Sequence, residues 1–376
     1  MSRSLNRLIP ALLLLAAGPA AAEIPLDVIA DTEIFIDGLF QADKNIFNSD
    51  RAQFKDDAEM RRAEVIFRGK HVSGLELMFG YDPKADKWLD ASVKGRLNAF
   101  TTWRVGQFKQ PNSLEELAAT RHNEFISKSM VTNVFGVARR TGAELATEGR
   151  NWTATGTWFG RELTRNLAAG SGYGARATWA PKLELDEFGM ADFVHLGLSA
   201  ISMDTRADTL RLRARPGADL TPIRLVDSGT FTTVDRITTI GAEAAWGQGP
   251  LLVQGEVYQS SIDRTVGQDF DASGWYVQGV WTLTGERHGY KSGLISTPLP
   301  SEPLRGMWSV GLRYEGLDLD DGTALRGGEE KNLTAGVNWY WRTNFKFMAN
   351  YVDVQSERRG IEDNPSIVEL RAQLMF

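Results

Sequence analysis

The chain of 376 residues contains no cysteine. A disulfide framework, a thiolate nucleophile and a cysteine-ligated metal centre are therefore excluded. Histidine is also scarce, and the four that occur are spaced in a way that forms no metal-binding cluster. The sequence has neither a glycine-rich phosphate loop nor a nucleophile elbow. We therefore expect no cofactor, no metal ion and no enzymatic activity.

Long apolar runs are equally rare. One lies at the N-terminus, where Arg3 and Arg7 precede an apolar core at residues 8–17, and alanines at residues 20–22 form a small-residue cleavage site. These features predict a secretory signal peptide at residues 1–22. The alternative, a transmembrane helix, needs about 20 apolar residues, which is more than this run supplies. We expect residues 23–376 to form one exported domain whose stability comes from its fold rather than from disulfides.

What the chain has instead is alternation of apolar and polar side chains. Successive side chains of a β-strand point to opposite faces. A strand with one apolar and one charged face suits hydrocarbon on one side and water on the other, which is the pattern of a transmembrane β-barrel. The C-terminal ten residues show the pattern most clearly, with Val368, Leu370, Ala372, Leu374 and Phe376 on one face and Glu369, Arg371 and Gln373 on the other.

The same alternation recurs from about residue 60 onward, and the 11 tryptophans fall mainly near the ends of the expected strands. Aromatic girdles at the two membrane interfaces require that placement. A soluble core rich in aromatics is the alternative, but it leaves the charged opposite faces unexplained. About 14 to 18 strands fit, and we predict an all-β, antiparallel transmembrane barrel of 16 strands because bacterial barrels use even numbers. The polar stretches at residues 204–230, 286–302 and 318–331 are expected to be extracellular loops.

One connection is far longer than the usual loop. About thirty residues separate the strand ending near Phe108 from the next one near Arg140. Ser113 and Glu116 have the spacing of a helix capping box, and the segment carries apolar side chains such as Leu114 and Leu117 that need a packing surface. We therefore expect this third loop to fold into the lumen and narrow the pore.

Charge supports that interpretation. Residues 94–140 contain eight basic and three acidic residues, although the whole chain has a net charge of −6. Basic side chains in a narrow water-filled pore attract anions and repel cations, and arginine suits phosphate oxygens. The alternative is that these side chains pair with Glu64, Glu76, Asp90 and Glu144 and only solvate the wall. The candidate path residues are Lys94, Arg96, Arg104, Lys109, Arg121, Lys128, Arg139 and Arg140, together with Arg68 and Lys70 from an earlier strand.

The same residues carry a family resemblance. The run from Arg104 to Pro111 followed by residues 113–117, with residues 332–340, 347–351 and 369–374, resembles the phosphate-selective porin O and P family of Gram-negative outer membranes. The resemblance implies a 16-stranded trimeric barrel in the outer membrane, with an inward-folded third loop and basic lumen residues that pass phosphate or polyphosphate. It places Lys109 and Arg121 near the constriction. The partners it implies are small anions such as phosphate, membrane lipid, lipopolysaccharide and two further copies of the chain, and no nucleic acid.

The leading functional hypothesis is a passive anion-selective channel, with phosphate first among its solutes. A general or cation-preferring porin remains open, if inward-facing acids such as Glu76, Asp90, Glu243, Glu256 and Glu369 outweigh the bases. A hydrolase that uses His122 or His195 with a serine is a further alternative, although no converging triad is visible. A structural barrel without conductance is the last.

Overall fold

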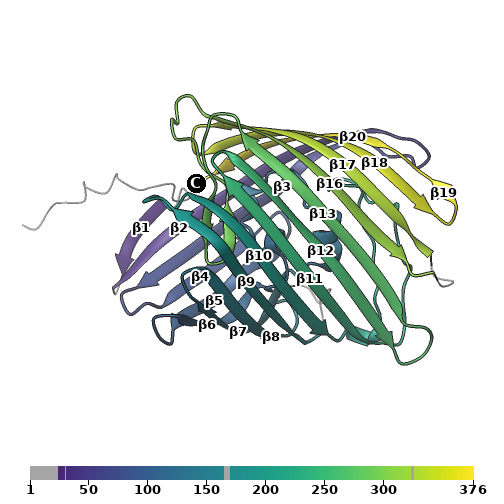
Figure 1. Cartoon of the computed structure of the whole chain (residues 1–376), viewed down its shortest axis with the longest axis horizontal. Coiled ribbons are helices and arrows are strands. Elements are labelled where there is room, and N and C mark those ends of the chain that lie inside the picture. The colour runs from purple at the N-terminus through teal and green to yellow at the C-terminus, as the bar shows by residue number, and fades with distance from the viewer. Residues whose placement is uncertain (1–23, 30, 165–169, 323–325) are drawn as a thin grey trace, which may run out of the picture.

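A computed structural model describes residues 24–376 except 30, 165–169 and 323–325 (Figure 1). The signal peptide expected at residues 1–22 lies outside the described residues. Among the described residues, none of the helices has the length and apolarity that a membrane span requires.

Within the described residues, sixteen strands close into an antiparallel barrel, which confirms the predicted fold class. Neighbouring strands pair in chain order, and the last strand closes the ring by pairing with β2. The ring consists of β2 (Thr32–Asn48), β3 (Asp57–His71), β4 (Glu76–Asp82), β5 (Lys87–Arg96), β6 (Thr101–Lys109), β7 (Arg139–Glu148), β8 (Trp152–Phe159), β9 (Gly172–Leu185), β10 (Ala191–Met203), β11 (Val234–Gln248), β12 (Leu251–Arg264), β13 (Phe270–Thr282), β16 (Met307–Asp320), β17 (Arg326–Trp341), β18 (Phe345–Arg358) and β20 (Ser366–Met375).

Shorter elements lie outside this ring order. β1 (Ile24–Ile29) pairs with the first residues of β2, and β19 (Ile361–Glu362) pairs with the end of β18. β14 (Gly289–Lys291) and β15 (Leu294–Ser296) form a separate hairpin. The helices are short: α1 (Leu114–Leu117), η1 (Thr120–His122), α2 (Met130–Phe135) and η3 (Arg206–Asp208).

The alternation of the sequence decides which face each side chain occupies. In β17, Leu333 is exposed on the outer face, whereas Asn332 and Thr334 are buried inside the barrel. In β20 the inward Arg371 donates to the Asp43 carboxylate of β2 at 2.7 and 2.6 Å. The outer face is therefore apolar and the inner face polar, as a strand between hydrocarbon and water requires.

The two ends of the barrel differ. One end carries the short turns 72–75, 97–100, 149–151, 249–250 and 342–344 and the C-terminus, and we call it the turn end. The other carries the longer connections 110–138 and 204–233, and we call it the loop end. In bacterial barrels short turns face the periplasm and long loops face outward.

Two of the loop expectations are wrong. The connection 283–306, predicted at the extracellular side through residues 286–302, joins β13 to β16 and so lies at the turn end. Most of residues 318–331 belongs to β16 and β17, which extend to Asp320 and from Arg326. Both stretches were predicted to be loops because they are polar. The side of the barrel on which a connection lies depends instead on how many strands precede it, and a polar stretch can still pair as a strand.

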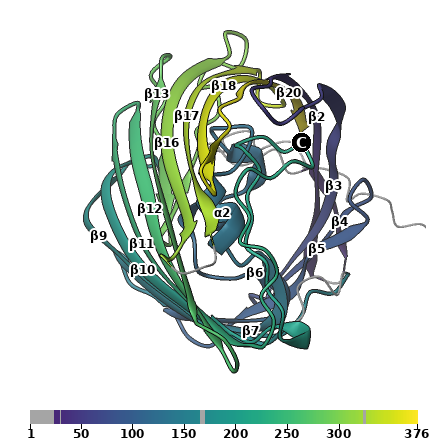
Figure 2. The ribbon, with the colours of Figure 1, turned by 90° about the vertical axis from the view of Figure 1, so that its right-hand side faces the viewer.

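The interior is filled unevenly. Apolar side chains of α2 and of the connection 204–233 form one buried cluster with inward residues of β11, β12, β13 and β16. Figure 2 shows α2 inside the ring of strands, where it packs against β12, β13 and β16. Inward side chains of β10 to β20 are mostly buried, whereas many inward side chains of β3 to β7 stay accessible. The accessible inner side chains therefore lie mainly along the β3 to β7 wall.

Candidate ion passage and the segments that line it

The third loop, residues 110–138, is built from two capped helical turns. The Ser113 hydroxyl accepts a hydrogen bond from the Glu116 backbone N–H at 3.0 Å, so it caps α1 as the sequence predicts. The Ser129 hydroxyl caps α2 in the same way by accepting from the Thr132 N–H at 3.2 Å. The caps leave other N–H groups at each helix start free to bind acceptors on the barrel wall.

Carboxylates of the wall supply those acceptors. Glu256 of β12 accepts from the backbone N–H groups of Leu114 at 2.9 Å and Glu115 at 2.8 Å. Glu315 of β16 accepts from the Met130 N–H at 2.6 Å. Glu369 of β20 accepts from the Ser127 hydroxyl at 3.0 Å. Three separate strands thus hold the third loop through carboxyl oxygens that accept from its N–H and O–H groups.

These contacts correct one part of the cation-preferring hypothesis. Glu256 and Glu369 were expected to face the open lumen, but they are 2 % and 1 % exposed behind the third loop. Glu243 is 6 % exposed and binds Arg176. Sequence alternation identified all three as inward residues, but it could not show that other segments would cover them.

Glycines on the inner face make room for the loop. A Cβ on Gly274 of β13 would lie 2.4 Å from Cγ1 of Val131 in α2. A Cβ on Gly311 or Gly336 would lie 3.0 or 3.3 Å from the ring of Phe125. The loop therefore packs directly against backbone at these three positions.

We expect Gly274→Val to displace α2 from the wall, because its side chain would occupy the space of Val131. Overpacking of this kind costs on the order of 1–3 kcal/mol. Limited proteolysis of the folded barrel should then cleave within residues 110–138 faster than in the wild type. Gly156→Val is the matched control, since nothing lies within 4 Å of a Cβ there; equal cleavage of the two variants would contradict this packing.

A cavity of about 430 Å³ lies on the other side of the third loop, against β4 to β9. It reaches from Lys109 and Asp90 to Gly74 and Asn98 at the turn end. We call it the turn-end passage. Its basic lining residues are Lys94, Arg96, Arg104, Lys109, Arg176 and Lys291, and its acidic ones are Glu76, Asp90, Glu144 and Glu148.

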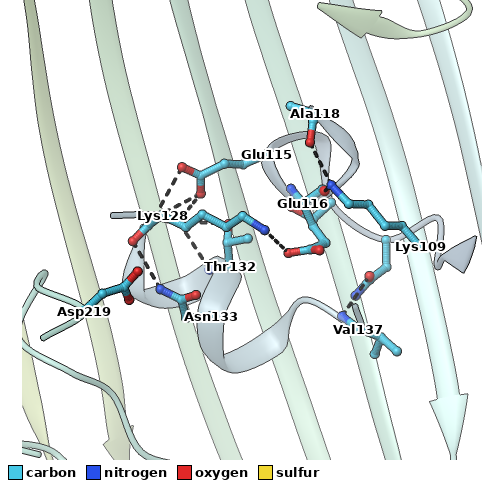
Figure 3. Close-up of polar contacts among 12 residues, drawn as sticks. Lys109, Glu115, Glu116, Ala118, Lys128, Thr132, Asn133, Val137 and Asp219 are labelled. Carbon is cyan, nitrogen blue, oxygen red and sulfur yellow. Dashed lines mark hydrogen bonds and ion pairs between the residues drawn. The ribbon is translucent and has the colours of Figure 1, made fainter. Parts of the chain in front are cut away.

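Four of the predicted path residues line this passage. Within the described part of the chain, the side chains of Lys94 and Arg96 take part in no ion pair. Arg104 pairs with Glu144 of the neighbouring strand at 3.4 Å. The Lys109 ammonium donates to the carbonyl oxygens of Glu116 at 2.6 Å and Ala118 at 2.8 Å (Figure 3).

The other six predicted residues do not line this passage. Arg121 and Arg68 both lie beside the buried Asp37 carboxylate, at 3.7 and 2.9 Å, and Lys70 lies over the Phe35 ring. The remaining three bind within or beside the third loop: Lys128 pairs with Glu116 (Figure 3), Arg139 pairs with Asp90 at 2.8 Å, and Arg140 donates to the Arg139 carbonyl at 3.0 Å. Most of these residues are close to one another in the sequence and were therefore predicted to line one path. In the structure they are bound to different partners and do not line this passage.

Sequence reasoning missed Lys291 and Arg176. Lys291 was assigned to an extracellular loop, but the β14–β15 hairpin carries it into the turn-end passage. Arg176 is one of the polar positions of β9, and nothing near it in the sequence marks it as a lining residue. It binds Glu243 and donates to the Gly293 carbonyl of the hairpin at 2.8 Å.

The two histidines considered as catalysts have structural partners. His195 is fully buried, with its ring nitrogens 2.8 Å from the Tyr290 hydroxyl and 2.8 Å from the Glu243 carboxylate. Burial and the adjacent Arg121 guanidinium lower the pKa of His122 to about 4, so this ring is neutral at pH 7. Within the described residues, no group of three or more histidine, aspartate or glutamate side chains could hold a metal ion.

A second basic cluster lies on the connection 204–233 and was also missed. The guanidinium groups of Arg215 and Arg224 both donate to the Thr221 carbonyl, at 3.0 and 3.2 Å. Burial, together with the neighbouring Arg215 and Arg213, lowers the pKa of Arg224 to about 10. The alternating arginines at positions 211, 213 and 215 were the available sequence signal.

Within the third loop, the Glu116 carboxylate forms an ion pair with Lys128. Although burial opposes its ionisation, the adjacent Lys128 and Lys109 ammonium groups lower its pKa to about 2 from 4.5. A depressed pKa stabilises the folded loop above pH 4.5, and this stabilisation is lost as the pH falls toward 2.

We therefore expect wild type to exceed Glu116→Gln in loop stability by about 3 kcal/mol at pH 7 and to lose that advantage by pH 2. Proteolysis of the third loop by an acid-active protease at low pH, and by trypsin at pH 7, measures the difference. If the wild type resists proteolysis better than Glu116→Gln by the same factor at both pH values, the charge of the Glu116 carboxylate does not stabilise the loop.

A closed antiparallel barrel with an apolar outer face, a charged inner face and segments packed inside it defines an outer-membrane porin. The family comparison makes this specific: residues 34–376 match the family "Phosphate-selective porin O and P". The chain belongs to that family, which confirms the resemblance of its motifs, and its location is the Gram-negative outer membrane.

Individual relatives are more distant. The chain is 28 % identical over 315 residues to an uncharacterized protein of Caulobacter vibrioides, covering 78 % of this chain and 62 % of that protein. It is 31 % identical over 152 residues to Porin O of Pseudomonas aeruginosa, covering 36 % of this chain and 34 % of Porin O. The chain thus spans less than two thirds of the length of either relative. An anion-selective porin from Comamonas acidovorans has the same fold, with a TM-score of 0.56, 12 % identity, and coverage of 92 % of this chain and 100 % of the porin.

Proposed function

We propose that the protein is a passive, anion-selective outer-membrane channel whose physiological solutes are phosphate or related anions. The proposal rests on where the acidic and basic side chains of the lumen lie. Acids of the long strands are buried against the third loop, whereas the accessible passage is lined by six basic and four acidic side chains.

Ion pairing leaves the basic excess of two unchanged, because two lining bases, Arg104 and Arg176, and two lining acids, Glu144 and Asp90, are paired. Two of its four acids are in ion pairs with guanidinium groups, Glu144 with Arg104 and Asp90 with Arg139. Lys94, Arg96 and Lys291 line the passage and have no carboxylate ion-paired to them in the described structure. A low-dielectric wall concentrates the field of such bases in the water between them, which enriches anions and repels cations.

Phosphate is the favoured solute for two reasons: the family to which the chain belongs is described as phosphate-selective, and the passage offers hydrogen-bond donors to an oxyanion. Lys109 has two of its ammonium hydrogens on loop carbonyls, which leaves a third for an oxyanion that reaches the narrow end of the passage. In this proposal the third loop narrows the pore at this point, and the arginines of the connection 204–233 meet anions on the loop-end side. We also propose a homotrimer in contact with lipopolysaccharide, as the family resemblance implies.

Planar bilayers containing the purified protein test the proposal. Under a potassium chloride gradient the reversal potential should show preference for chloride, and phosphate in the bath should reduce the chloride current by occupying the passage. Preference for potassium would refute the anion hypothesis and support the general or cation-preferring porin.

Neither a hydrolase nor a structural barrel gains support from the described residues. A hydrolase would need its histidine within reach of a serine hydroxyl, whereas His195 binds a tyrosine and a glutamate. A structural barrel would have no conductance, so the same bilayer recording distinguishes it from a channel.

A further inference from the structure

The turn-end passage is lined by apolar as well as charged side chains. The barrel wall contributes Lys94, Arg96 and Arg104, and the segments packed inside the barrel contribute Leu117 at the end of α1 and Leu294 at the start of β15, beside Lys291 of β14. Both leucines are partly exposed where they line the passage. Apolar surface in contact with water costs free energy, and a hydrated inorganic anion offers nothing to cover it.

The two leucines come from different segments that are tied together. The third loop enters the barrel from the loop end and the connection 283–306 enters from the turn end. The two segments meet where the Thr297 hydroxyl lies 2.8 Å from the His122 carbonyl oxygen and 2.6 Å from the Glu124 carboxylate, within hydrogen-bond distance of both. Leu114 is buried in an apolar cluster against which Leu294 packs. Part of the contact between the two segments is therefore apolar. Leu114 is buried within it, and Leu117 and Leu294 lie where it borders the passage.

The hairpin that carries Leu294 is held firmly. Arg176 donates to the Gly293 carbonyl at 2.8 Å, the Tyr290 hydroxyl lies 2.8 Å from His195, and the Tyr290 ring lies 5.0 Å from the Phe193 ring. The Ala191 N–H donates to the His288 carbonyl at 2.9 Å. A partly exposed leucine on a segment fixed by so many contacts is a permanent feature of the passage wall.

We propose that the passage preferentially conducts organic anions that combine one carboxylate with a short apolar body, in addition to inorganic oxyanions. The inference rests on the proposed anion channel and specifies its substrate class. The carboxylate would bind Lys94 and Arg104, while the apolar body would cover Leu117 and Leu294. Inorganic phosphate can use only the charged groups.

Reversal potentials in planar bilayers with the potassium salts of chloride, phosphate, acetate and hexanoate test the inference. A simple water-filled pore passes hexanoate more slowly than acetate because hexanoate is larger. We expect the wild type to pass hexanoate at least as well as acetate, and hexanoate to reduce chloride current at lower concentration than acetate does.

The double variant Leu117→Asn, Leu294→Asn should lower the hexanoate-to-acetate permeability ratio three- to tenfold while chloride and phosphate potentials stay unchanged. Leu304→Asn is the matched control, because Leu304 is an exposed leucine of the same connection that does not line the passage. Unchanged chloride conductance shows that the double variant is folded. Anion preference with hexanoate below acetate in the wild type, or an unchanged ratio in the variant, would overturn the substrate class alone. Potassium preference in every salt would overturn the anion channel itself.

Discussion

Replacing Lys94 and Arg96 by glutamate is expected to reverse the ion preference of the channel. Both side chains line the turn-end passage and neither is ion-paired in the described structure. The double change turns the formal charge of the passage lining from +2 to −2. In a narrow low-dielectric passage this should change the chloride-to-potassium permeability ratio by at least about tenfold, and the reversal potential under a potassium chloride gradient should change sign.

The matched control for this variant is Lys331→Glu. Lys331 lies on the outer, exposed face of β17, so its charge is separated from the passage by the barrel wall. The control should keep the wild-type reversal potential even though it alters the net charge of the protein. If the double variant also keeps that potential, selectivity is set elsewhere, and the arginines of the connection 204–233 become the next positions to change.

Glu256→Ala is expected to release the third loop and raise single-channel conductance. One carboxylate accepts from two backbone N–H groups, the Ser113 hydroxyl at 3.2 Å and the hydroxyls of Tyr258 and Tyr276 at 2.5 and 2.8 Å. A buried donor left without an acceptor costs about 1–3 kcal/mol, and Glu256→Ala removes the acceptor of several such donors. The loop should therefore lose at least about 3 kcal/mol of its attachment to β12.

Bilayer recordings of Glu256→Ala should show larger and noisier current steps than the wild type. Glu256→Gln keeps one acceptor oxygen and should give an intermediate result. Gln254→Ala removes the next inward side chain of β12, whose amide binds Tyr276 rather than the loop, so its conductance should match the wild type. Wild-type conductance in Glu256→Ala would mean that Glu315 and Glu369 suffice to hold the loop.

Much of the barrel could be predicted from the chain before the structure was known. The period of two assigned Leu370 to the outer face and Arg371 to the inner one, and the structure places both as assigned. Those assignments are correct because the face of a side chain in a strand is a local property, determined by the residue's own position in the pleat. The Ser113 cap of α1 is local for the same reason.

The accessibility of each lumen residue was not predictable in this way. Glu256 and Lys94 have equivalent positions in the sequence pattern, yet the first is buried against Leu114, 142 residues away in the chain, and the second faces the passage. The placement of Lys291 likewise depends on the parity of the strands before it. The sequence by itself determined the barrel, its two faces and a basic third loop, because each follows from local periodicity and spacing. Only the tertiary structure decided which charges meet the solute, because that depends on which segments fill the lumen and which carboxylates they cover.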